Sequence, residues 1–273
     1  MKNVELFLTG AKNVPFGKYA RLLLSVLTTH AVLNSNEKGG VRITYKSISE
    51  LTKEMLLPRQ RSREIQQQLD LFSLSSFQFK EKITKRVQKS LFEGYEGIEG
   101  EFEAEWNNHG NIPFMKKLSW ISLKDMDKKT SDNNVIGITI DLSEDFVELC
   151  KNHSVPIDYT VYSQISSPLA KDIYAWLIYR NNVIEEDEEI FIPRSSLIEQ
   201  FVNYDEKGEN KEIVMATGYS YVIEQIKIIK EKYYKNLKVE YAHDGSGIYL
   251  HKSKPVIEDK DKRYILLTND ILL

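Results

Sequence analysis

A very short break between two helix signals constrains the fold of this chain more than any other feature. Ser47 followed by Glu50 is a capping-box pattern, which predicts a helix over residues 47–55. Pro58 interrupts this helix and suits the first turn of the next one, which we predict over residues 59–72. Two helices joined so closely predict a helix-turn-helix.

The segments around this motif extend it into a larger unit. Apolar residues at helical spacing predict a long helix over residues 16–34. Short strands are expected at residues 41–44, 77–79, 118–123 and 137–140. This order is typical of a winged helix-turn-helix, and the polar segment 80–113 would be its long wing or a mobile insertion.

The same order of elements returns in the second half of the chain, although no sequence repeat accompanies it. Long helices are expected at residues 168–180 and 217–234. A short strand and a short helix are expected between them, at residues 190–193 and 195–201. The turn at residues 244–247 predicts a final hairpin.

We therefore predict an α+β fold with two tandem winged-helix (helix-turn-helix) domains that carry β-hairpin wings. The N-terminal domain would span residues 1–141, with a wing insertion near 80–115, and the C-terminal domain residues 142–255. Residues 256–273 would form a tail, of which 264–267 can pack back onto the protein.

The predicted helix at 59–72 carries the first group of candidate DNA-binding residues. When Ile65 and Leu69 face the core, its arginine and glutamine side chains point outward, and these types read guanine and adenine edges in the major groove. The candidates are Arg59, Arg61, Arg63, Gln66 and Gln67, with Arg61 expected on phosphate. A solvated helix face is the alternative interpretation.

Two further groups are weaker candidates, because each also suits a plain solvated surface. One combines the N-terminal half of the helix at 217–234 with an earlier arginine: Thr217, Tyr219, Ser220, Lys227 and Arg194. The other is a basic run in the expected wing: Lys80, Lys82, Lys85 and Arg86. The acidic stretch 93–105 would cover this basic surface, mimic DNA for a partner, or form a solvated loop.

Charge and composition narrow the function classes. The chain has 273 residues and a net charge of -3, which argues against a protein that coats nucleic acid without sequence preference. Cys150 is the one cysteine, so no intrachain disulfide can form and a reducing, cytoplasmic location is expected. No apolar run is long enough to span a membrane, and we expect neither a secretory signal nor a membrane partner.

Enzyme motifs are weak or missing in the sequence. There is no phosphate-binding G-x-x-x-x-G-K-[ST] loop, and the five histidines form no H-x-H pair. Asp125 and Asp127 form a D-x-D pattern that a metal-dependent primase or nuclease could use, but no partner ligand is evident. Cys150 lies beside Leu149 on a predicted helix and is expected to be a buried, inert thiol without an evident basic activator. We therefore expect no enzyme activity, no cofactor and no metal.

Several stretches resemble one known family, the RepA-type plasmid replication initiators. They are residues 15–24, 47–55, 63–79, 140–180 and 236–255. The most specific is 140–180, which contains LSEDFVEL, VPIDYTVYSQI and SPLAKDIYAWLIYR. The resemblance implies two winged-helix domains that bind repeated double-stranded DNA sites at an origin. It also implies duplex opening, recruitment of a host helicase or initiator, and a homodimer.

Three other functions stay open from the residues alone. A transcriptional repressor or copy-control protein could use the same scaffold. A protein-interaction module without DNA binding would account for the acidic stretch. A metal-dependent primase or nuclease would depend on Asp125 and Asp127.

Overall fold

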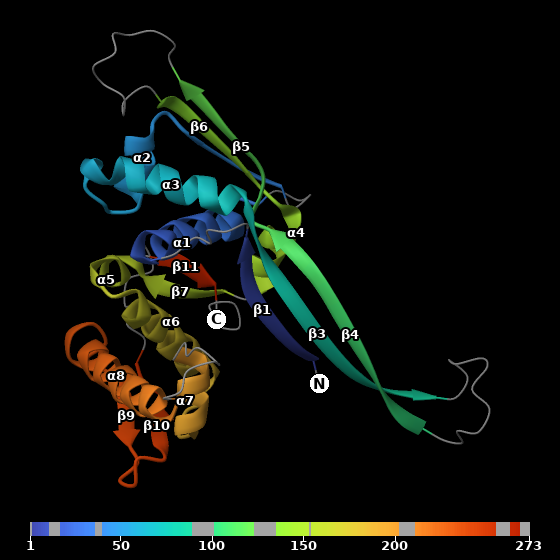
Figure 1. Cartoon of the computed structure of the whole chain (residues 1–273), viewed down its shortest axis with the longest axis vertical. Coiled ribbons are helices and arrows are strands. Elements are labelled where there is room, and N and C mark those ends of the chain that lie inside the picture. Colours follow the sequence, from blue (N-terminus) through green and yellow to red (C-terminus); the bar gives the residue numbers. More distant parts are fainter. Residues whose placement is uncertain are drawn as a thin grey trace.

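The computed structural model describes residues 2–10, 17–35, 40–88, 101–122, 135–152, 154–201, 211–254 and 263–267. Helices and small antiparallel sheets make up an α+β fold (Figure 1). Among the described residues, no helix is long and apolar enough to cross a membrane.

The first half is built around α1, a long helix that lies against α3 and α4. Its helices are α1 (Gly17–Leu33), α2 (Ile48–Glu54) and α3 (Ser62–Ser73), the last preceded by the 3-10 turn η1 (Arg59–Arg61). Its strands are β2 (Val41–Tyr45), β5 (Met115–Ser122) and β6 (Val135–Leu142). They form one antiparallel sheet in the order β2-β6-β5, so the strand before α2 pairs with the second strand of the later hairpin.

The junction between α2 and α3 follows from local chemistry. The Ser47 hydroxyl caps α2 by accepting a hydrogen bond from the backbone N–H of Glu50, as the capping pattern predicts. At the other end, the backbone N–H of Leu56 bonds to Lys53 O and that of Leu57 to Thr52 O. This is a Schellman ending, which needs a left-handed residue, and Leu56 supplies it with φ 53°. The sharp reversal between the two helices is therefore encoded within a few residues.

A separate three-stranded sheet projects from this half of the molecule (Figure 1). It consists of β1 (Lys2–Gly10), β3 (Ser75–Gln88) and β4 (Glu101–Pro113), in the order β1-β3-β4. The segment expected as a wing or mobile insertion thus forms most of a long hairpin between α3 and β5. The hairpin that pairs back to β2 is β5–β6 instead. Of the acidic stretch 93–105, the described part begins β4, and residues 93–100 lie outside the described residues.

Three short elements connect the two halves. They are α4 (Glu144–Asn152), β7 (Ser154–Asp158) and α5 (Tyr159–Gln164). Ser143 caps α4, since its Oγ accepts from the Phe146 N–H at 3.1 Å. The last described strand, β11 (Arg263–Leu267), pairs antiparallel with β7 and lies against α1, so residues 264–267 pack back as expected.

The second half repeats the topology of the first. Its helices are α6 (Pro168–Val183), α7 (Arg194–Phe201) and α8 (Lys211–Lys232). Its strands are β8 (Glu189–Pro193), β9 (Lys238–Tyr241) and β10 (Gly247–His251), in the order β8-β10-β9. As with β2 and β6, the strand between the first two helices pairs with the second strand of the closing hairpin.

The apolar core runs without interruption from α1 through α4 and α6 to α8. Its largest fully buried side chains include Trp176, Tyr159, Tyr162 and Tyr174. The hydroxyl of Tyr159 lies 3.5 Å from Leu22 O, across the junction of the two halves. The predicted domain division at residue 141 therefore falls on elements that share one core.

Candidate nucleic-acid interface

Helix α3 exposes a polar stripe and buries the apolar stripe on its opposite side. Ile65, Leu69 and Phe72 are buried, as the sequence predicts. Arg63 and Gln67 are exposed and four residues apart, so they lie one turn from each other on the outer face. Gln66 is half-buried at the edge of this stripe. The arrangement leaves a guanidinium and a carboxamide available for planar, two-point hydrogen bonding.

The start of α3 adds cations around an aromatic ring that the sequence reasoning did not single out. Arg59 is exposed in η1. Arg61 is also exposed, but its Nη1 donates to Glu64 Oε1 at 2.9 Å, and its guanidinium lies 5.9 Å from the ring centre of Tyr19. Lys18 Nζ lies 5.1 Å from the same ring. Arg61 is therefore partly engaged, whereas Arg59 and Arg63 form no ion pair with another described residue.

Asp70 is exposed near the C-terminal end of α3, on the same stripe, and it contacts the neighbouring sheet. The indole N–H of Trp120, on β5, donates a hydrogen bond to its carboxylate. Partial burial raises the pKa of Asp70, and the Trp120 hydrogen bond opposes this shift. The pattern of apolar residues predicts Asp70 on the outer face, but it could not show that β5 would reach it. This contact links the outer edge of α3 to β5.

The second candidate group gathers where α7 and α8 meet the β9–β10 turn. Arg194 lies over the ring of Tyr219 at 4.6 Å, and its backbone N–H bonds to Ser246 O at 2.7 Å. Thr217 and Ser220 are exposed on the adjacent turn of α8. The group thus combines residues of α7, α8 and the β9–β10 turn.

Lys227 lies further along α8 and is exposed. Its ammonium is 5.3 Å from the ring centre of Tyr241, on β9. The sequence did not indicate that Tyr241 would contact Lys227, because a tyrosine at this position could equally belong to the core. Burial raises the pKa of the Tyr241 phenol to about 12.

The four basic candidates of the expected wing all fall on β3: Lys80, Lys82, Lys85 and Arg86. In the register of the sheet, Lys80 pairs with Glu5 of β1 and Arg86 with Glu103 of β4. The basic strand is thus the central one, flanked by two strands that carry acidic residues. Their side chains lie outside the described structure, so contact with DNA stays a prediction.

Among the described residues, no cluster of three or more His, Cys, Asp or Glu side chains could hold a metal ion. Asp125 and Asp127 lie outside the described residues. Cys150 is buried, and burial raises the pKa of its thiol far above the usual range, which keeps it protonated and unreactive.

Comparison with known proteins gives a family for this chain. Residues 14–192 match the family model described as plasmid encoded RepA protein, which is a class of plasmid replication initiators. The chain belongs to the RepA family. A search of curated proteins gives no match.

Two solved structures match this chain at low sequence identity. The crystal structure of RctB domains 2–3 has 10% sequence identity and a TM-score of 0.46, with 98% of this chain and 87% of that chain covered. A selenomethionine-derivative structure of domains 2 and 3 of RctB has 13% identity and a TM-score of 0.47, with 94% and 91% covered.

Proposed function

We propose that this protein is a sequence-specific, double-stranded DNA-binding replication initiator with two winged-helix domains. Helix α3 would read DNA in the first domain and α8 in the second, with β5–β6 and β9–β10 as the wings. Membership of the RepA family supports the replication role. The repeated topology of β2-β6-β5 and β8-β10-β9 supports the winged-helix assignment.

The observation that carries this proposal is the outer face of α3. Arg63 and Gln67 are exposed one turn apart and are free of ion pairs with other described residues. Arginine bonds to guanine O6 and N7, and glutamine to adenine N6 and N7, each through two hydrogen bonds. Arg59 at the start of the motif would contact the DNA backbone, as a cation beside the groove does in other helix-turn-helix proteins.

Opening of an origin would then draw on binding energy. The sequence contains no G-x-x-x-x-G-K-[ST] loop, so strand separation would follow from bending and unwinding of bound DNA. We infer no enzyme activity, a cytoplasmic location, recruitment of a host helicase or initiator, and binding to origin repeats as a homodimer. The long edges of the β1-β3-β4 sheet are suitable for pairing two copies.

Footprinting on DNA from around the gene, at several salt concentrations, tests the proposal. A variant with Arg63→Ala and Gln67→Ala is compared with Lys151→Ala and Asn152→Ala, which removes the same two chemical types from the exposed end of α4. We expect protected repeats that disappear only in the first variant. Protection without strand opening would indicate a repressor on the same scaffold, and no protection at any salt concentration would refute DNA binding by the chain.

A further inference from the structure

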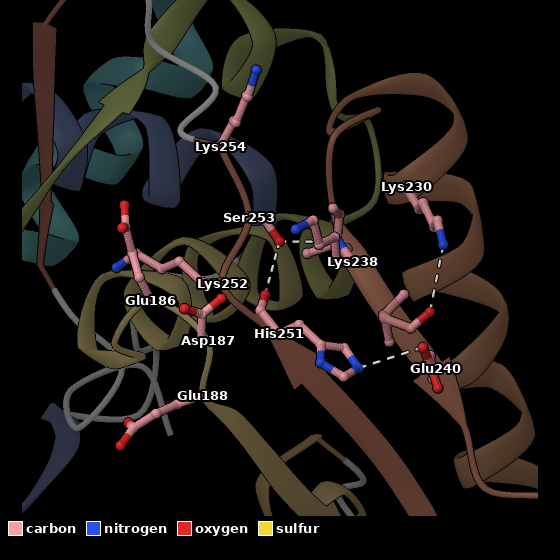
Figure 2. A pocket seen from close by; sticks show the side chains of 12 residues that line it. Glu186, Asp187, Glu188, Lys230, Lys238, Glu240, His251, Lys252, Ser253 and Lys254 are labelled. Carbon is pink, nitrogen blue, oxygen red and sulfur yellow. Dashed lines mark hydrogen bonds and ion pairs between the residues drawn. The ribbon is translucent and has the colours of Figure 1, made fainter.

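A hollow beside the β8-β10-β9 sheet contains charges that offset each other. It has a volume of about 820 Å³ and is lined by four carboxylates and four lysines. Figure 2 shows the acidic residues 186–188 on one side of it, and Lys230 and Glu240 on the other. Lysines that donate to backbone carbonyls, such as Lys252, keep their charge. This hollow therefore favours neither anions nor cations.

The surface where α1 meets η1 and the first turn of α3 carries, in contrast, unbalanced positive charge. Lys18 lies at the start of α1, and η1 and α3 contribute Arg59, Arg61 and Arg63. Arg61 Nη1 donates to Glu64 Oε1 at 2.9 Å, so this guanidinium is paired. Lys18, Arg59 and Arg63 form no ion pair with another described residue. Such a surface attracts anions, although the whole chain has a net charge of -3.

The groups behind this surface do not offset the charge of Lys18. Lys171 of α6 is fully buried, and burial lowers its pKa to about 7, with Lys18 and Arg21 adding repulsion. Asp172 attracts Lys171, but both of its carboxylate oxygens accept hydrogen bonds from Arg21. The carboxylate of this junction is therefore already engaged, and Lys18 adds to a positive potential at the start of α1.

The ring of Tyr19 brings cations from two elements together. Lys18 Nζ lies 5.1 Å from the ring centre, and the guanidinium carbon of Arg61 lies 5.9 Å from it. These contacts hold both cations beside one phenol, so little side-chain freedom remains to be lost when a ligand binds. A guanidinium has five N–H donors, and the bond to Glu64 leaves several of them free. An ammonium, a guanidinium and a phenol thus offer hydrogen-bond donors at one place.

A phosphate is the anion that suits this set of donors, because its oxygens accept several charge-assisted hydrogen bonds at once. We propose that Lys18, Tyr19 and Arg61 hold a backbone phosphate of the DNA whose bases α3 reads. This inference rests on the proposed DNA binding by α3, and it adds α1 to the surface that contacts the duplex. Phosphate contacts carry no sequence information, so this one fixes the position of α3 and contributes affinity on any sequence.

Binding of the full chain to a protected repeat and to a scrambled duplex, over a series of KCl concentrations, tests this contact. Lys18→Gln should weaken binding about tenfold on both duplexes, and lower the slope of log affinity against log salt by about one. The ratio of the two affinities should stay unchanged, since no base contact is lost. Lys18→Arg keeps the positive charge and should keep the slope of the parent.

Two further measurements separate a phosphate contact from a purely structural role of the ring. Tyr19→Phe keeps the ring and removes the phenolic O–H, so it should weaken binding about threefold on both duplexes without changing the slope. Ethylation of single DNA phosphates locates the contact. Ethylation of one phosphate should weaken binding of the parent much more than binding of Lys18→Gln, because this variant has already lost a charged partner of that phosphate.

Lys254→Gln is the matched control, since it removes an exposed lysine from the hollow with balanced charges. It should bind both duplexes within about twofold of the parent and with the same slope. If Lys18→Gln also keeps the slope, the contact is refuted while DNA binding by α3 stands. If the parent binds neither duplex, DNA binding by the chain fails as well.

Calorimetry with inorganic phosphate distinguishes the DNA backbone from a free anion. We expect no measurable binding of inorganic phosphate alone, because a single phosphate lacks the remaining contacts of the duplex. Binding of inorganic phosphate that is lost in Lys18→Gln, together with unchanged duplex affinity in that variant, would indicate a site for a free anion and overturn the proposal.

Discussion

Arg21 of α1 and Asp172 of α6 form a two-point ion pair across the junction of the two halves, although 151 positions separate them in the sequence. The Nε–Oδ1 distance is 2.5 Å, and the side chains are 19% and 11% exposed. The pair fixes the helix that supports α3 against the first helix of the second half. If the two halves met in another arrangement, Arg21 and Asp172 would each be largely buried without a partner of opposite charge.

Removing one member of this pair should destabilise the protein more than removing both. Asp172→Leu leaves Arg21 in a largely buried site without its carboxylate, at a cost of about 3 kcal/mol. Arg21→Met combined with Asp172→Leu should recover much of that loss, because no buried charge then lacks a partner. Urea denaturation of the two single variants and the double variant measures the coupling. Additive losses would contradict this account.

Lys171 should make stability depend on pH. It is fully buried, donates to the backbone carbonyl of Tyr162, and has a pKa lowered to about 7 by burial, with Lys18 and Arg21 adding repulsion and Asp172 opposing it. Between pH 7 and the ordinary value of 10.5, the unfolded chain holds a proton that the folded one has released. Stability from this group is therefore present at high pH and lost as pH falls to about 7.

The comparison with Lys171→Met isolates that contribution. From pH 7 to 9 the parent should gain stability relative to this variant, with a slope of at most ~1.4 kcal/mol per pH unit. Chemical denaturation at several pH values measures the difference. A constant difference across this range would show that Lys171 keeps its proton in the folded protein.

Leu56 should be replaceable by glycine with a gain in stability. Its φ of 53° lies in the left-handed region, and its side chain is 52% exposed, so it gives up little packing. Leu56→Gly should stabilise the protein by about 0.5–1 kcal/mol, through relief of this strain. Leu74→Gly is the control, because Leu74 is also exposed, at 73%, but has an ordinary φ of -104°. Its change should be destabilising in the same thermal melts.

Gly247 should tolerate no side chain. A Cβ there would lie 2.2 Å from Ile192 O and 2.9 Å from Phe191 Cζ. Gly247→Ala should therefore cost about 2 kcal/mol by pushing β8 away from β10. Gly245→Asn in the same turn is the comparison, since its φ of +70° suits asparagine and nothing lies within 4 Å of the added Cβ. Equal stability of both variants would contradict the close approach of β8 to Gly247.

Local signals predicted much of the fold. Ser47 and Glu50 placed α2, and the turn at residues 244–247 placed the β9–β10 hairpin, because both depend on neighbours within a few positions. β1 was missed, since a strand near the start of the chain finds its partner only in β3. The pairing of β7 with β11 is likewise non-local.

The candidate site shows the same division. The exposed stripe of α3 follows from helical spacing, and the structure brings Arg63 and Gln67 onto it. The ring of Tyr19 beside Arg61, and the hydrogen bond from Trp120 to Asp70, depend on which elements meet in space. Helical periodicity predicts which side chains point outward but not which of them are then engaged by a neighbouring strand.

The most direct test of DNA reading by α3 is the affinity of Arg63→Ala for a protected repeat and for a scrambled duplex at the same salt concentration. We predict that binding to the repeat weakens about tenfold to hundredfold while binding to the scrambled duplex changes little, so the ratio of the two collapses. Lys151→Ala should preserve the ratio. An equal loss on both duplexes would leave the ratio unchanged, and would contradict base reading by Arg63 and the assignment of α3 as a reading helix.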